Sequence, residues 1–154
     1  MPDGLYERDA LAWAELQAAL LRRVAAGELV NDAVDWANVI EEVADVGLSE
    51  LRACRSLLLQ AMVHLLKLHA APGDQAAGHW REEAGTFLDD AEQRFSPSMR
   101  QRVDLDELYA KALRRAQAAT DGSAPQPFPD ACPFTLDALL SGNVPGLVSV
   151  LDRQ

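Results

Sequence analysis

Three histidines are candidates for catalysis or metal binding, because imidazole groups perform acid–base chemistry near neutral pH and bind metals. They are His64, His69 and His79. No HExxH or HxxxH spacing occurs, so no pair of imidazoles shares one face of a helix. His64 and His69 lie about 140° apart around a helix and would not hold one ion together. A structural role, either solvated or hydrogen-bonded, is therefore the expectation for His64.

Helical bundles also bind metals through carboxylates and histidines that come from several helices. The candidate set for such a metal-binding or hydrolytic site is Glu41, Glu42, Asp45 and His64. No glutamate stands three residues before a histidine, which is the spacing of di-iron bundles. Adjacent acids such as Glu41 and Glu42 are typical of the solvent-facing side of a helix. The sequence therefore assigns no catalytic residue, no metal ligand and no cofactor.

Nucleophilic catalysis has little support. Cys54 falls on an apolar helix stripe and is expected to be a small core residue, and nothing near Cys132 in the sequence would activate its thiol. The chain has no GxSxG pattern and no glycine-rich phosphate loop. The two cysteines match no CxxC spacing, so neither a disulfide scaffold nor a structural zinc site is predicted. A reducing cytoplasm is the simplest compartment.

Composition places the chain among soluble globular proteins. It has 154 residues, of which 49% are hydrophobic and 25% charged, and its formal net charge is −10. Such a charge opposes binding to nucleic acids and to anionic membranes. The first four residues lack the basic cluster and apolar core of a signal peptide, and the apolar run Leu57–Leu68 is too short to span a bilayer.

Apolar residues recur at helical spacing in four segments, which predicts four helices that hold the candidate residues in place. The predicted helices cover Leu5–Ala26, a long segment from Asp32 or Asp35 to about His69, a third segment through Trp80 and Phe95, and a fourth from the Asp104–Glu107 capping box to about residues 120–122. Gly27 ends the first helix, and the turn at 71–74 ends the second. Ser96 is expected to act as a cap ahead of Pro97.

The long helix has one apolar side and one polar side. The apolar side collects Trp36, Val39, Val43, Cys54, Leu57, Ala61, Leu65 and Leu68. The polar side collects Asp35, Asn38, Glu42, Asp45, Ser49, Ser56, Gln60, His64 and Lys67. Over Leu57–Leu68 the apolar arc is widest, which predicts a position at the centre of a bundle or against a second subunit. Gly47 makes a bend possible without forcing a break.

Asp9 and Gln17 border the apolar stripe of the first helix beside Trp13. Burial of such groups is costly unless they are hydrogen-bonded. They are therefore expected either to tie the first helix to the long helix or to the proline-rich segment, or to line a small cleft.

The predicted fold is all-α, a bundle of about four helices with one long central helix. Prolines extend the segment 123–133, with Phe128, Cys132 and Phe134 as anchors. Thr135 is expected to cap a short helix to Leu140, and the end of the chain to be loosely ordered. The chain is predicted to form a single domain over residues 1–154, with 122–154 packing on the bundle as an extended tail.

These motifs, in their order, resemble the bacterial family catalogued as domain of unknown function 29. The matching residues are Tyr6, Asp9 and Trp13; Asp35, Glu41, Glu42 and Gly47; His64-Leu65-Leu66-Lys67; Trp80-Arg81; Ser96-Pro97-Ser98; and Phe128-Pro129 with Cys132-Pro133. The resemblance implies a small all-helical bundle and transfers no catalytic residue. One departure is Leu68-His69, where the family leads us to expect an aromatic residue after the lysine.

Three functions are compatible with these observations. The leading hypothesis is a non-enzymatic cytoplasmic interaction module that self-associates, with a dimer favoured, because the long helix has more apolar circumference than a small bundle covers. The alternative is a metal-binding or hydrolytic bundle that uses the carboxylates and His64. An acidic mimic of nucleic acid that binds a basic protein rests on net charge alone.

Overall fold

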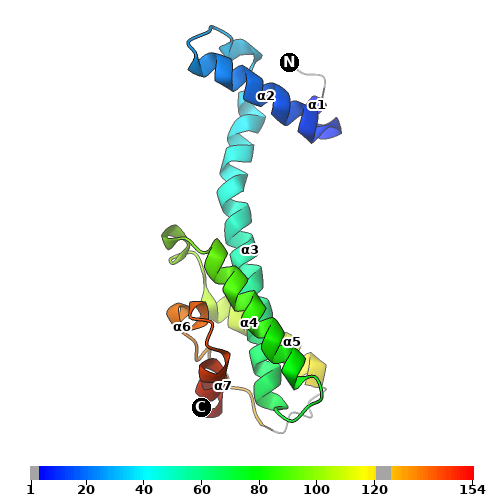
Figure 1. Cartoon of the computed structure of the whole chain (residues 1–154), viewed down its shortest axis with the longest axis vertical. Coiled ribbons are helices and arrows are strands. Elements are labelled where there is room, and N and C mark those ends of the chain that lie inside the picture. The colour runs from blue at the N-terminus through cyan, green and yellow to red at the C-terminus, as the bar shows by residue number, and fades with distance from the viewer. Residues whose placement is uncertain (1–3, 121–125) are drawn as a thin grey trace. The chain divides into compact units, whose positions relative to one another are not determined.

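The computed structural model describes residues 4–120 and 126–154, and this part of the chain is helical without a strand (Figure 1). Its α-helices are α1 (Leu5–Arg8), α2 (Ala10–Ala25), α3 (Trp36–Ala70), α4 (Ala77–Arg94), α5 (Leu105–Thr120), α6 (Leu136–Leu140) and α7 (Val144–Asp152). Two short 3₁₀ helices are η1 (Asn31–Ala33) and η2 (Pro97–Met99). The predicted all-α class with one long helix is confirmed. The start of the chain and the predicted end of the fourth helix, with part of the proline-rich segment, lie outside the described residues.

The chain divides into two compact units, Met1–Leu48 and Ser49–Gln154. The N-terminal unit contains α1, α2, η1 and the first part of α3. The C-terminal unit contains the rest of α3 and all later elements. The single-domain organisation over residues 1–154 stays a prediction.

The first helix is interrupted, contrary to the prediction of one helix over residues 5–26. Asp9 is extended, with φ −151°, and its side chain accepts a hydrogen bond from the Ala12 N–H at 3.0 Å. Aspartate is a favoured N-cap because its carboxylate satisfies a free N–H of the first turn, and here it starts α2. The predicted stop at Gly27 is confirmed, since this glycine has the left-handed φ of 87°.

The long helix starts as expected and is not interrupted. Asp35 directly precedes α3, and its Oδ1 lies 3.5 Å from the backbone nitrogen of Asn38. Asp35, rather than Asp32, is therefore the cap of the two that were predicted. Gly47 lies inside the helix without breaking it, since one glycine costs about 1 kcal/mol and the neighbouring residues favour helix.

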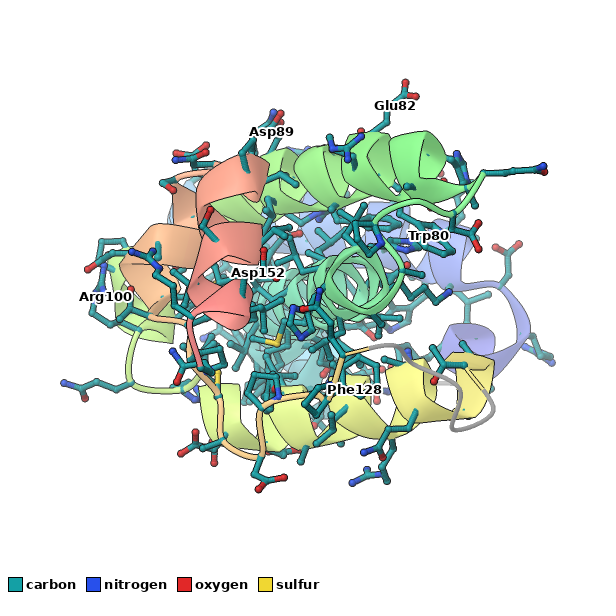
Figure 2. The ribbon with its side chains drawn as sticks, turned by 90° about the horizontal axis from the view of Figure 1, so that it is seen from below. Trp80, Glu82, Asp89, Arg100, Phe128 and Asp152 are labelled. Carbon is teal, nitrogen blue, oxygen red and sulfur yellow. The ribbon has the colours of Figure 1, made fainter. Side chains whose placement is uncertain are left out.

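The second part of α3 is the centre of the C-terminal unit. Figure 2 shows it end-on, with α4 on one side, α5 on the opposite side and α7 on a third. Residues of α3 that point to these neighbours are completely buried: Leu58, Met62, Leu65 and Leu66. Burial of side chains of this size is worth about 1.5–3 kcal/mol each and is the main source of stability here. The predicted core position of Leu57–Leu68 is confirmed.

The proline-rich segment packs on this core through its aromatic residues. Phe134 is buried and Phe128 is half-buried, as expected. The Tyr109 hydroxyl of α5 donates a hydrogen bond to the Pro129 carbonyl at 2.6 Å, and burial raises the pKa of Tyr109 to about 12. Thr135 accepts a hydrogen bond from the Ala138 N–H at 3.1 Å and caps α6, which confirms that prediction.

Two local predictions are wrong. Residues Val144–Asp152 form α7 rather than a loose end, because the Asn143 side chain accepts a hydrogen bond from the Gly146 N–H at 3.1 Å and Pro145 is compatible with a first helical turn. Leu147 and Leu151 bury the apolar side of this helix. Ser96 precedes η2 but makes no capping hydrogen bond.

Candidate functional site: an exposed apolar face of the N-terminal unit

Large apolar side chains remain exposed in one part of the molecule. Of the described residues, those that expose more than a third of a large apolar side chain all belong to the N-terminal unit. They are Leu11, Leu16, Leu29, Trp36, Ile40, Val43 and Val46. Single exposed leucines are common on protein surfaces, but contiguous apolar patches mark interaction sites.

Three of these side chains, Trp36, Ile40 and Val43, line up along the first part of α3 with Gly47, and we call these four positions the α3 seam. At 100° per residue these positions fall within about 60° of one another on the helix surface. Ile40 is 61% exposed and Val43 is 70% exposed. No atom lies within 4 Å of a Cβ added at Gly47, so the space above this glycine is open.

The same apolar spacing occurs in the C-terminal unit, but there the side chains are buried. Eighteen positions after the seam, about five helical turns, stand Cys54, Leu58, Ala61 and Leu65. All four are completely buried under the helices of their unit. Because the sequence pattern is alike in both places, apolar periodicity alone predicted burial for Trp36 and Val43. That prediction is wrong, and the excess apolar surface lies at 36–46 rather than at 57–68.

The N-terminal helices bind the polar edge of α3 instead of the seam. The Trp13 Nε1 donates a hydrogen bond to the Asp35 carboxylate at 3.0 Å, and the Tyr6 hydroxyl donates to the Glu42 carboxylate at 2.5 Å. Gln17, which is 2% exposed, accepts a hydrogen bond from the Asp35 backbone N–H at 2.8 Å. Gln17 therefore ties α2 to the start of α3, as predicted, whereas Asp9 caps its own helix.

These hydrogen bonds fix the ionisation of the groups at this edge. Bonds from Asn38 and then Trp13 lower the pKa of Asp35, so its carboxylate is held ionised. The bond to the Glu42 carboxylate raises the pKa of Tyr6, which keeps its phenol neutral as the donor.

Residues 1–48 contain three arginines against ten acidic residues, a formal net charge of −7. The unit combines an acidic edge with an uncharged seam.

The residues of the metal-site hypothesis are divided between the two units. Glu41, Glu42 and Asp45 belong to the N-terminal unit, where Glu42 accepts the bond from Tyr6, and His64 belongs to the C-terminal unit. Across residues 4–120 and 126–154, no three histidine, cysteine or acidic side chains are grouped so that they could hold a metal ion.

His64 has the hydrogen-bonded one of the two structural roles expected for it. Its Nε2 lies 3.1 Å from a carboxylate oxygen of Glu83 on α4, and its ring stacks on Phe87 with an interplanar angle of 3°. Burial, and then the positive charge of Lys67, lower the pKa of His64, although Glu83 opposes this. The neutral imidazole is therefore favoured in the folded protein.

His69 is the buried polar residue that sequence reasoning missed. It is 4% exposed, its Nδ1 lies 2.6 Å from the Asp152 carboxylate of α7, and its Nε2 lies 3.0 Å from the Pro127 carbonyl. The Pro127 carbonyl can only accept a hydrogen bond, so Nε2 is the donor to it. Leu68 beside it is also buried, so the departure from the family pattern is accommodated in the core.

The basic side chains that line one surface depression are paired within the protein. A depression of about 280 Å³ between α3 and α5 is lined by Arg55 and Lys111, but Glu107 pairs with both cations, at 3.2 Å and 2.7 Å.

Burial raises the pKa of the thiols of Cys54 and Cys132, which disfavours the reactive thiolate. The expectation that neither cysteine is activated agrees with this environment.

Comparisons with known proteins agree with an all-helical class defined by one long helix. The family model described as Domain of unknown function DUF29 matches residues 5–144, and the chain belongs to this family. It is similar to an alpha-helical protein of unknown function from Rhodospirillum rubrum, whose crystal structure was determined at 1.45 Å resolution. The two are 28% identical over 95% of this chain and 96% of the other, with a TM-score of 0.74. No curated protein matches the chain. None of the described helices has the length and apolar character needed to cross a bilayer.

Proposed function

We propose that this protein is a non-enzymatic cytoplasmic interaction module whose N-terminal unit docks a helical protein partner. One observation carries the proposal: the exposed large apolar side chains gather in this unit, and the α3 seam runs along one edge of a helix. Water contact with such a surface is unfavourable by roughly 25 cal/mol per Å², so a partner that covers it gains free energy. In the dimer expected from the sequence, the partner docked on this surface is a second copy of the chain.

The enzyme alternative has less support. A metal-assisted hydrolase needs ligands and an acid or base within reach of one substrate atom. The candidate carboxylates and His64 belong to different units, and the described residues contain no other metal-binding group. The partly buried His64–Glu83 pair is explained by packing against Phe87.

The test is site-specific photo-crosslinking in the cells that naturally produce the protein. A photoreactive side chain at Val43 should give a defined covalent adduct with a protein, because Val43 is 70% exposed and lies in the seam. The matched position is Ala110, which is exposed on α5 in the C-terminal unit. Absence of an adduct at Val43, or equal adducts at both positions, would overturn the proposed function.

A further inference from the structure

We infer that the partner covering the α3 seam is a second copy of this chain, paired antiparallel along residues 36–47 about a two-fold axis. This inference rests on the proposed function and names the partner for the same surface.

The spacing of the seam reads the same in both directions. Its positions are separated by four, three and four residues. An antiparallel copy therefore presents the same intervals to the first copy, as an isologous interface requires. With the axis between Glu41 and Glu42, Ile40 of one copy lies opposite Val43 of the second.

The side chains that this axis pairs are complementary in size. Trp36 falls opposite Gly47 of the second copy, where the space above the glycine is open. In this pair a larger residue meets a smaller one, which is the arrangement that lets facing helices interdigitate.

Charge is compatible with pairing of like copies at this surface. The seam itself carries no charged residue, and Glu41, Glu42 and Asp45 lie on the opposite half of the helix circumference. Two antiparallel copies therefore bring apolar side chains together and leave these carboxylates in water. A basic partner helix would meet no carboxylate in the seam itself, so the net charge of the unit would attract it only at longer range. Antiparallel helix dipoles also interact favourably.

The length of the seam sets the expected strength. Twelve helical residues extend about 18 Å, a short contact compared with the interfaces of obligate dimers. We expect dissociation in the micromolar range, where sedimentation velocity between about 1 and 100 µM resolves monomer and dimer.

The first experiment compares two variants of the purified full chain. Val43→Glu should shift the protein from dimer to monomer at about 50 µM, a loss of at least 100-fold in affinity, because a carboxylate would be buried in the seam. Leu11→Glu is the matched control, since Leu11 is also 70% exposed and carries the same charge change away from the seam. It should remain dimeric. Circular dichroism establishes that both variants fold, which is expected because both side chains are exposed.

The second experiment tests the antiparallel register by charge complementation. Ile40→Lys and Val43→Glu should each be monomeric, whereas an equimolar mixture should form a heterodimer, because the new ammonium group faces the new carboxylate across the axis. Parallel pairing would place each new charge opposite an apolar residue and would give no rescue. A wild-type dimer whose two variants fail to complement would overturn the antiparallel register.

The outcomes separate this inference from the proposed function. A wild-type chain that stays monomeric at about 100 µM, or a Leu11→Glu variant that dissociates as fully as Val43→Glu, would overturn the second copy as partner. An adduct at Val43 with a different protein would do the same while supporting the proposed function. An adduct with the mass of two copies supports both.

Discussion

His69 joins three segments that are far apart in the sequence. It lies in the last turn of α3, and its ring hydrogen-bonds to Asp152 of α7 and to the Pro127 carbonyl. Hydrogen bonds to charged groups contribute about 1.5–3 kcal/mol each. A single buried imidazole therefore holds the end of the chain on the core.

The first prediction concerns this residue. His69→Leu should lower the free energy of unfolding by about 2 kcal/mol, because the Pro127 carbonyl loses its donor and Asp152 loses its hydrogen-bond partner. Urea denaturation followed by circular dichroism measures the change. His79→Gln is the control, since its side chain is 66% exposed, and it should change stability by less than about 0.5 kcal/mol. Equal stability of both variants would contradict the role assigned to His69.

The second prediction follows from the lowered pKa of His64. The folded state binds a proton at this imidazole less readily than the unfolded chain, whose pKa is near 6.5. The contribution of His64 is therefore fully present above this pH and is lost as the pH falls. Urea denaturation at pH 8 and pH 5 should show a smaller loss of stability for His64→Gln than for the wild type.

His79→Gln serves as the control for that measurement. It removes the other imidazole that contacts Glu83, at 3.4 Å, but one whose side chain is 66% exposed, so the loss of stability between pH 8 and pH 5 should be larger than in His64→Gln. Acidic residues other than Glu83, which pairs with both His64 and His79, contribute equally to all three proteins, so their titration cancels in the comparison. Identical pH dependence for His64→Gln and the wild type would show that burial of His64 has no effect on its protonation.

At the scale of elements, α3 and α7 show where periodicity is informative. The long helix is recognisable because its apolar side continues over many turns and its cap, Asp35, is a typical helix start. The sequence does not predict α7, a helix of nine residues, because Pro145 and Gly146 are residue types that are unfavourable inside helices. Pro is tolerated there because it stands in the first turn, where backbone N–H groups lack helical partners anyway.

The third prediction concerns the start of α7. Asn143→Ala should lower the free energy of unfolding by about 1 kcal/mol, because it removes the side-chain acceptor for the Gly146 N–H. Chemical denaturation measures the loss. Ser149→Ala, an exposed position on the same helix, is the control and should have an effect within about 0.5 kcal/mol. A neutral Asn143→Ala would mean that packing of Leu147 and Leu151 alone fixes the helix.

At the scale of the whole molecule, the charge of the N-terminal unit is the dominant property. Its formal net charge of −7 accounts for most of the −10 of the chain. When two such units associate, they repel each other over a distance set by the ionic strength. Self-association and association with a basic protein therefore respond to salt in opposite directions.

The fourth prediction uses this difference. Raising the ionic strength from about 10 mM to about 100 mM shortens the screening length from roughly 30 Å to 10 Å and should increase the dimer fraction of the wild-type chain. Sedimentation velocity at constant protein concentration measures it, and Leu11→Glu should respond in the same direction. A dimer fraction that falls with added salt would contradict apolar pairing of two acidic units.

The all-α class, the long helix, the turns and most caps could be predicted, because these depend on local spacing and on residues such as Gly27, Asp35 and Thr135. The family could be recognised from motifs that lie in order along the chain. Which part of the apolar edge of α3 is covered could be seen only in the folded protein. Trp36 and Cys54 occupy equivalent positions in the pattern, yet one is 43% exposed and the other completely buried. The physical reason is that burial depends on which other helices pack nearby, and periodicity along one helix carries no information about them.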